Sequence, residues 1–252
     1  MNLSFDDLKN FLEEKTDLYN RQDFIKDDPI QIPHSFSLKQ DIEISGLLAA
    51  TLAWGKRIII INSSRKLMQL MDNQPYDFVM NHSYNDLKVF KNFKHRTYNS
   101  NDVIFFIKGL KSIYHEYNSL ENAFAGNEPY VGIINFRTKM MQTAHEYRSE
   151  KHISNPAKGS AAKRLNMFLR WMVRKDKSNV DFGIWNNYKP SQLYIPLDVH
   201  SGRVARELGL LKRKQNDKKA VEELTAKLRV FDSNDPVKYD YALFGLGVFE
   251  NF

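Results

Sequence analysis

Apolar residues recur every three or four positions along most of this chain, which is the spacing of amphipathic helices. Sustained alternation of apolar and polar residues, the mark of a half-buried strand, is scarce. We therefore predict an all-α fold. The predicted helices cover 41–54, 58–71, 75–80, 101–117, 131–147, 160–174 and 220–231, with further helices after Ser4, after Asp198 and from Asp235-Pro236.

Two early helices carry predicted capping boxes, in which a Ser or Thr caps the helix and an acidic or amide residue follows three positions later. Ser4 with Asp7 fits this pattern, and so does Ser37 with Gln40. The stretch 41–54 is apolar on nearly every side. A helix of that kind is buried, so we expect it at the centre of the fold.

The length of 252 residues is sufficient for one large domain or two smaller ones. We expect a single all-α unit with two helical lobes. Residues 37–150 would form a central lobe, and residues 1–36 together with 151–252 would form the lobe that carries the candidate chemistry.

Charge and composition limit the kinds of partner and cofactor that the protein can bind. The formal net charge is +7 and the pI is about 9.3, which favours polyanions such as nucleic acid. The absence of cysteine excludes disulfides, thiolate zinc sites and cysteine-ligated iron–sulfur clusters. We predict no cofactor and no metal. The polar start of the chain and the lack of a long apolar run predict no membrane association and a cytoplasmic location.

The segment 196–210 places a carboxylate where chemistry is plausible. Asp198 follows a Pro-Leu pair and opens a helix, with Val204 and Leu208 on its apolar face. An aspartate at this position caps a helix whether or not it has another role, so a purely structural Asp198 is the alternative. Upstream, Gly159 opens another predicted helix that contains Lys163.

These two segments resemble the helix-hairpin-helix DNA glycosylases, such as endonuclease III and the 8-oxoguanine glycosylases. The resemblance implies a multi-helix fold of two lobes with a cleft between them. It implies Asp198 as the catalytic aspartate and Lys163 as the nucleophile, with Lys158 as the alternative nucleophile. Two departures are visible: Ala161 stands at the second glycine of the family's hairpin, and Lys163 and Asp198 are 35 residues apart, farther than in endonuclease III.

The same resemblance suggests further site residues. Residues suggested for nucleic-acid binding are Lys56, Arg57, Gly159, Arg164, His200 and Arg203. Residues suggested for a base pocket or wedge are Thr51, Trp54, Trp185 and Tyr188. A structural role is the alternative for each of them. Trp171, on an apolar stripe, is expected in the core, whereas the Gly, Asn and Pro residues around Trp185 and Tyr188 predict an exposed loop.

The chain is also similar to an uncharacterised bacterial family, domain of unknown function 2400. That family supplies no activity, so the expected activity follows from the glycosylase resemblance: a DNA-repair glycosylase with AP-lyase activity, acting on duplex DNA with a damaged base. The alternatives are a non-catalytic nucleic-acid-binding protein on the same fold and a helical interaction protein. The sequence leaves three points open: which lesion is recognised, whether the substrate is DNA or RNA, and which oligomeric state the protein adopts.

Overall fold

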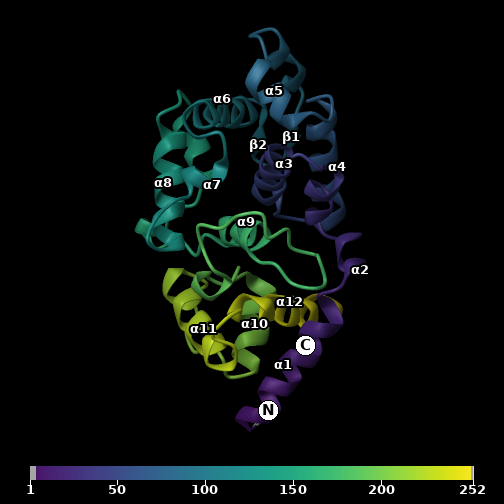
Figure 1. Ribbon diagram of the computed structural model, residues 1–252, viewed down its shortest axis with the longest axis vertical. Helices are drawn as coiled ribbons and strands as arrows, with labels where there is room; N and C mark the ends of the chain where they lie inside the picture. The colour runs from purple at the N-terminus through teal and green to yellow at the C-terminus, as the bar shows by residue number, and fades with distance from the viewer. Residues whose placement is uncertain (1–3, 251) are drawn as a thin grey trace. The chain divides into compact units, whose positions relative to one another are not determined.

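The computed structural model describes residues 4–250 and 252, and α-helices and short 3-10 helices make up most of them (Figure 1). Within these residues the strands are limited to β1 (Lys94–His95) and β2 (Tyr98–Asn99), which pair antiparallel as a hairpin. The all-α prediction is confirmed. None of the helices in the described part of the chain is long and apolar enough to cross a membrane.

The chain divides into two compact units. The terminal unit contains both ends of the chain, up to Phe24 and from Pro156 onward, and the central unit is Ile25–Asn155. Residues 25–36 and 151–155, which the sequence assigned to the lobe with the chain ends, belong to the central unit. For residues 25–36 the reason is local packing, because the 3-10 helices η1 (Pro29–Gln31) and η2 (Pro33–Ser35) pack on α3.

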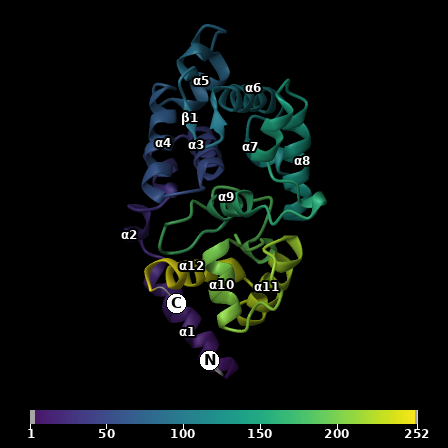
Figure 2. The ribbon, with the colours of Figure 1, turned by 180° about the vertical axis from the view of Figure 1, so that it is seen from behind.

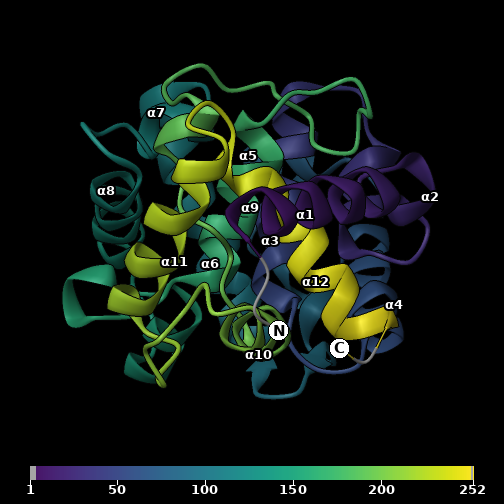
Figure 3. The ribbon, with the colours of Figure 1, turned by 90° about the horizontal axis from the view of Figure 1, so that it is seen from below.

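In the terminal unit, the C-terminal helix α12 (Tyr239–Phe249) packs against both α1 (Phe5–Tyr19) and α10 (Val199–Glu207), as Figures 2 and 3 show. The approach to α1 is close, because a Cβ added to Gly245 would lie 2.1 Å from Tyr19 Cδ2. The remaining elements of this unit are η5 (Pro156–Lys158), α9 (Lys163–Val173), η6 (Pro190–Gln192), α11 (Lys218–Phe231), η7 (Pro236–Lys238) and α2 (Gln22–Ile25), which crosses the unit boundary.

In the central unit, α3 (Lys39–Leu52) is buried from Ile42 to its last residue, as its all-round apolar sequence predicts. Its one buried carboxylate, Glu43, accepts hydrogen bonds from Tyr114 Oη (2.7 Å) and the backbone N–H of Leu120 (3.0 Å). The other elements of this unit are α4 (Arg57–Gln69), α5 (Pro75–Asn81), η3 (Asp86–Phe90), α6 (Ser100–Tyr117), α7 (Leu120–Ala123), α8 (Pro129–Met141) and η4 (Tyr147–His152).

One predicted helix cap agrees with the structure, and several predicted helix ends differ from it. The cap at Ser4 is confirmed, since its hydroxyl accepts from the N–H of Asp7 at 3.2 Å. The capping box at Ser37 is wrong, because α3 begins at Lys39 after Leu38, which makes no side-chain cap bond. The helix predicted over 131–147 ends at Met141. The helix predicted from Ser160 begins at Lys163, because the residue before it has a left-handed backbone.

Candidate active site

Lys163 is the first residue of α9 and follows a tight turn. Gly159 (φ +83°) and Ala162 (φ +49°) both have left-handed backbones, which prevents the helix from starting earlier. Hydrogen bonds hold the turn: the Ala162 N–H donates to Ser160 Oγ (3.2 Å), and the Lys218 N–H donates to the Gly159 carbonyl (3.0 Å). The start of α9, and with it Lys163, is therefore fixed by the turn and by its contact with α11.

Asp198 is the N-cap of α10 and uses one oxygen for that purpose. Its Oδ1 accepts from the N–H groups of His200 (2.9 Å) and Ser201 (3.0 Å), and Ser201 Oγ returns the bond by accepting from the Asp198 N–H (3.0 Å). This reciprocal capping box fixes the side chain. The second oxygen, Oδ2, is not needed for the cap and is available to another group.

That second oxygen faces Lys163. Lys163 Nζ lies 3.7 Å from Asp198 Oδ2, and the two side chains are 26% and 21% exposed. The amine also lies 3.7 Å from Met167 Sδ, one turn further along α9. Two residues 35 positions apart in the sequence thus form an ion pair that is partly sheltered but still open to solvent.

The segment between α9 and α10 folds back onto the end of α9. The N–H groups of Phe182 and Trp185 donate to the carbonyls of Trp171 (2.8 Å) and Met172 (2.9 Å), which the helix leaves unpaired at its C-terminus. Further along, the N–H of Ile195 donates to Thr225 Oγ1 (3.2 Å) on α11. These contacts close the long connection and bring Asp198 back to the start of α9.

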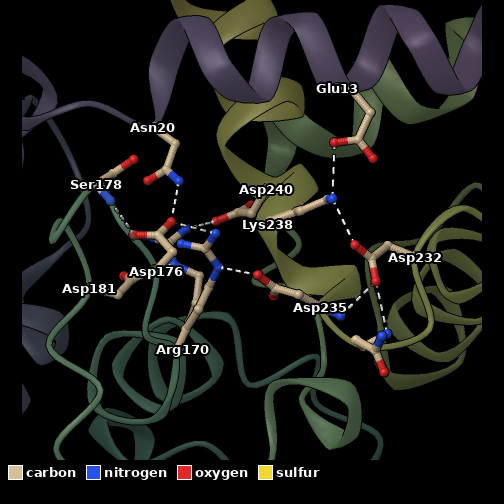
Figure 4. Close-up of polar contacts among 12 residues, drawn as sticks. Glu13, Asn20, Arg170, Asp176, Ser178, Asp181, Asp232, Asp235, Lys238 and Asp240 are labelled. Carbon is tan, nitrogen blue, oxygen red and sulfur yellow. Dashed lines mark hydrogen bonds and ion pairs between the residues drawn. The ribbon is translucent and has the colours of Figure 1, made fainter.

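A buried cluster of charges lies further along α9, and Figure 4 shows many of its contacts. Arg170 contacts Asp240 and, through Nε, Asp181 Oδ1 (3.3 Å). Arg174 contacts Asp176 (2.7 Å), Asp181 (3.1 Å) and Asp235 (2.8 Å). Sequence reasoning missed this cluster. Its one local signal is a pair of arginines four residues apart, Arg170 within α9 and Arg174 at its C-cap.

The predicted exposure of Trp185 and Tyr188 is wrong. Trp185 is 2% exposed and packs edge-on against Phe168, with ring centroids 5.2 Å apart, and Tyr188 is 4% exposed. The turn residues around them correctly indicate irregular structure, but the fold-back onto α9 buries their rings. Neither ring offers a face to a nucleotide in this structure. Trp171 is fully buried, so its predicted place in the core is confirmed.

The polar residues predicted near the pair occupy different settings. Lys158 lies at the end of the exposed turn η5, and the exposed Gly159 has open space where a Cβ would lie. His200 is exposed at the start of α10. Arg203 donates to the Gly247 carbonyl on α12 (3.2 Å). Arg164, next to Lys163 on α9, is half-buried. The ion pair singles out Lys163 over Lys158 as the partner of Asp198.

The remaining predicted residues lie in the central unit, around the end of α3. Thr51 is buried within that helix, so it presents no surface to a ligand. Trp54 is half-buried, and the Arg96 guanidinium lies 4.8 Å from its ring centroid, a cation–π contact. Lys56 is exposed at the N-cap of α4, and Arg57 is the first residue of that helix.

In the terminal unit, Lys163 and Asp198 thus form an ion pair at the starts of two helices, in a protein of all-α class. The chain belongs to the family described as protein of unknown function (DUF2400), whose model matches residues 28–249. The match covers nearly all of the central unit and most of the terminal unit, including Lys163 and Asp198. Comparison with curated proteins and with solved structures gave no match.

Proposed function

We propose that the chain is a cytoplasmic DNA-repair glycosylase with AP-lyase activity and a fold like that of the helix-hairpin-helix glycosylases. Its substrate would be duplex DNA that carries a damaged base. Lys163 would be the nucleophile, and Asp198 would be its acid–base and electrostatic partner.

The observation that carries this proposal is the distance of 3.7 Å between Lys163 Nζ and Asp198 Oδ2. An amine is a nucleophile only after it loses a proton, and a carboxylate beside it is a suitable acceptor. The capping bonds to Oδ1 orient the carboxylate without occupying Oδ2. Nucleophile and base are therefore held by backbone structure on separate helices, as a preorganised site requires.

The chemistry follows from these two groups. The Lys163 amine attacks the sugar C1′, the bond from C1′ to the base breaks, and the base leaves with the electron pair and takes up a proton. The negative charge of Asp198 stabilises the cationic sugar as the base departs, and Asp198 then accepts the proton that the amine loses as the bond from C1′ to nitrogen forms. Opening of the sugar ring gives a Schiff base. Loss of a C2′ proton then expels the 3′ phosphate, which is the lyase step.

Two further features support a DNA substrate. The net charge of +7 favours a polyanion. A lysine side chain is also exposed five residues before Lys163, at Lys158 in the turn before α9. Such residues bind phosphate groups regardless of base sequence.

Borohydride trapping tests the proposal, because reduction of a Schiff base leaves a stable covalent adduct between protein and DNA. The probes are duplex oligonucleotides with 8-oxoguanine, uracil, an oxidised pyrimidine or an abasic site. We expect an adduct that Lys163→Ala abolishes and that the matched control Lys158→Ala retains. Asp198→Asn should abolish base release. Normal rates in Lys163→Ala or Asp198→Asn would refute these roles.

A second candidate function is nucleic-acid binding without catalysis. Ala161 occupies the second glycine position of the hairpin, and Asp198 is fully explained as a helix cap by its Oδ1 contacts. Salt-sensitive binding to duplex DNA with no adduct and no base release would favour this function. A lack of DNA binding at moderate salt would favour a helical interaction protein instead.

A further inference from the structure

The central unit separates its charges along the chain. Residues 44–71 and 87–101 contain eight lysines and arginines and no acidic residue. The other residues of this unit contain eight lysines and arginines and 13 acidic residues. The two segments therefore have a formal charge of +8, in a unit whose other residues have a formal charge of −5. Charge of one sign gathered in this way favours a partner of the opposite sign.

The two segments meet in the fold. β1 packs on α4, and both views of the ribbon show the hairpin beside that helix (Figures 1 and 2). His95, the buried residue of β1, connects them: its Nδ1 lies 2.9 Å from Ser63 Oγ and its Nε2 lies 3.4 Å from the Trp54 carbonyl oxygen. The Arg96 guanidinium covers the Trp54 ring, as described above. The hairpin is therefore fixed against the end of α3 and the start of α4.

Gly55 permits the close approach of Arg96. Its backbone has φ +112°, which favours glycine, and a Cβ added to it would lie 2.7 Å from Arg96 Nη1. The guanidinium thus lies against the backbone that leads directly into Lys56. A guanidinium stacked on an aromatic ring keeps its N–H donors in its own plane, and these donors match the oxygens of a phosphate group.

Four exposed cations at this junction have no acidic partner in the described part of the chain. We call this surface the hairpin face, and its members are Lys56, Lys91, Lys94 and Arg96. Other cations of the same unit differ, since Arg137, Lys139 and Arg148 each contact a carboxylate. A cation without an acidic partner binds a phosphate and releases a counterion without breaking an ion pair in the protein.

Two exposed isoleucines next to Lys56 raise a membrane surface as another polyanionic partner. Ile58 is 61% exposed and Ile59 is 49% exposed, both in the first turn of α4. Helices that lie on membranes present a long apolar face to the lipid. In α4 the next apolar residues, Ile60 and Ile61, are buried inside the unit. Two isoleucines in one turn do not make such a face, so the cations favour nucleic acid.

We propose that the hairpin face binds the phosphate backbone of duplex DNA, without regard to base sequence or damage. The choice of DNA as the polyanion rests on the proposed function. The four cations contact phosphate oxygens through charge-assisted hydrogen bonds, which hold the duplex but read no bases. All four belong to the central unit, whereas Lys163 and Asp198 belong to the terminal unit, so the hairpin face binds undamaged DNA as well.

The salt dependence of binding tests this proposal with the full chain. The probe is an undamaged, fluorescently labelled DNA duplex, and anisotropy gives the association constant from about 50 to about 200 mM salt. Each phosphate contact adds about 0.9 to the slope of log K against log [salt]. Replacing Lys91, Lys94 and Arg96 together with alanine should reduce the slope by about 3. Across this salt range the variant should lose roughly 40-fold less affinity than the unmodified protein.

Two matched triple variants are the controls. Lys91→Arg, Lys94→Arg and Arg96→Lys together keep every charge and should retain the slope. Alanine at Lys108, Lys175 and Lys227 removes three exposed lysines elsewhere and should retain it too. An unchanged slope in the hairpin-face variant, or an equal reduction in the second control, would overturn the proposal. If the hairpin-face variant does not fold, Lys94→Gln alone should reduce the slope by about 1, and no reduction would overturn the proposal equally.

Two further measurements separate the alternatives. Sedimentation with vesicles of phosphatidylcholine and phosphatidylserine, without salt-dependent DNA binding, would overturn the proposal in favour of a membrane surface. Borohydride trapping separates this inference from the proposed function. Salt-dependent binding that needs the hairpin face, without any adduct, would refute the glycosylase function and support the inference. An adduct together with an unchanged slope in the hairpin-face variant would refute the inference alone.

Discussion

Replacing Arg174 with methionine removes a guanidinium group from the buried cluster while keeping the length of the side chain. Arg174 is 3% exposed and contacts three carboxyl groups. Two of these, on Asp176 and Asp235, are about one-fifth exposed, but Asp181 is fully buried and would depend more heavily on its 3.3 Å contact with Arg170. Breaking a buried pair on one side costs about 3–5 kcal/mol, and the partly exposed partners place this case near 3 kcal/mol.

The loss should depend on pH, because protonation relieves the carboxyl groups that lose their partner. Loss of the Arg174 charge raises the folded-state pKa values of Asp176 and Asp235, so the difference in the free energy of unfolding between the two proteins grows as pH rises from the lower to the higher pKa. The variant should therefore be closer to the unmodified protein at about pH 5 than at about pH 8.

Urea unfolding followed by tryptophan fluorescence measures this effect. A Trp54→Phe background leaves only Trp171 and Trp185, both buried in the terminal unit, as reporters. A loss of about 3 kcal/mol lowers the midpoint by roughly 1–3 M urea. Arg213→Met, which breaks the one-third exposed pair with Asp217, is the control and should hardly move the midpoint. A shift no larger than the control's, or one independent of pH, would refute the reasoning.

Three further predictions concern stability and exposure. Asp198→Ala should lower the free energy of unfolding by about 1 kcal/mol through loss of the α10 cap, whereas Asp198→Asn should change it by only a few tenths, as urea midpoints will show. Iodide should quench Trp185 fluorescence only weakly; strong quenching would contradict its burial. Hydrogen bonds from His152, Ser149 and Asn99 hold the pKa of Asp102 below its usual range despite burial. The central unit should therefore lose stability as pH falls below about 4, and less so in Asp102→Asn, when unfolding is followed by Trp54 fluorescence.

The sequence predicted those helices whose ends are set by residues adjacent to them in the chain. The apolar run from Ile42 to Leu52 is a buried helix, and Asp198 caps α10. The start of α9 was misplaced because two left-handed residues, Gly159 and Ala162, precede it and only one of them is a glycine. Alanine carries no local signal for that backbone conformation.

Burial of loop residues and pairing across the chain were not predictable from the sequence alone. Trp185 lies among turn-forming residues, yet hydrogen bonds to the end of α9 bury it. Asp240 and Arg170 are 70 residues apart, and nothing in either local sequence identifies the other as its partner. The pair of Lys163 with Asp198 was predicted through family resemblance, and the structure brings the two side chains together.

Identification of the lysine that becomes linked to DNA tests the central claim most directly. The protein is trapped with borohydride on duplex DNA containing an abasic site, digested with a protease, and the modified peptide is sequenced by mass spectrometry. The account predicts a reduced adduct on Lys163, in the peptide that begins α9. An adduct on Lys158 or another lysine, or no adduct with DNA binding intact, would contradict the assignment of Lys163 and Asp198 as the catalytic pair.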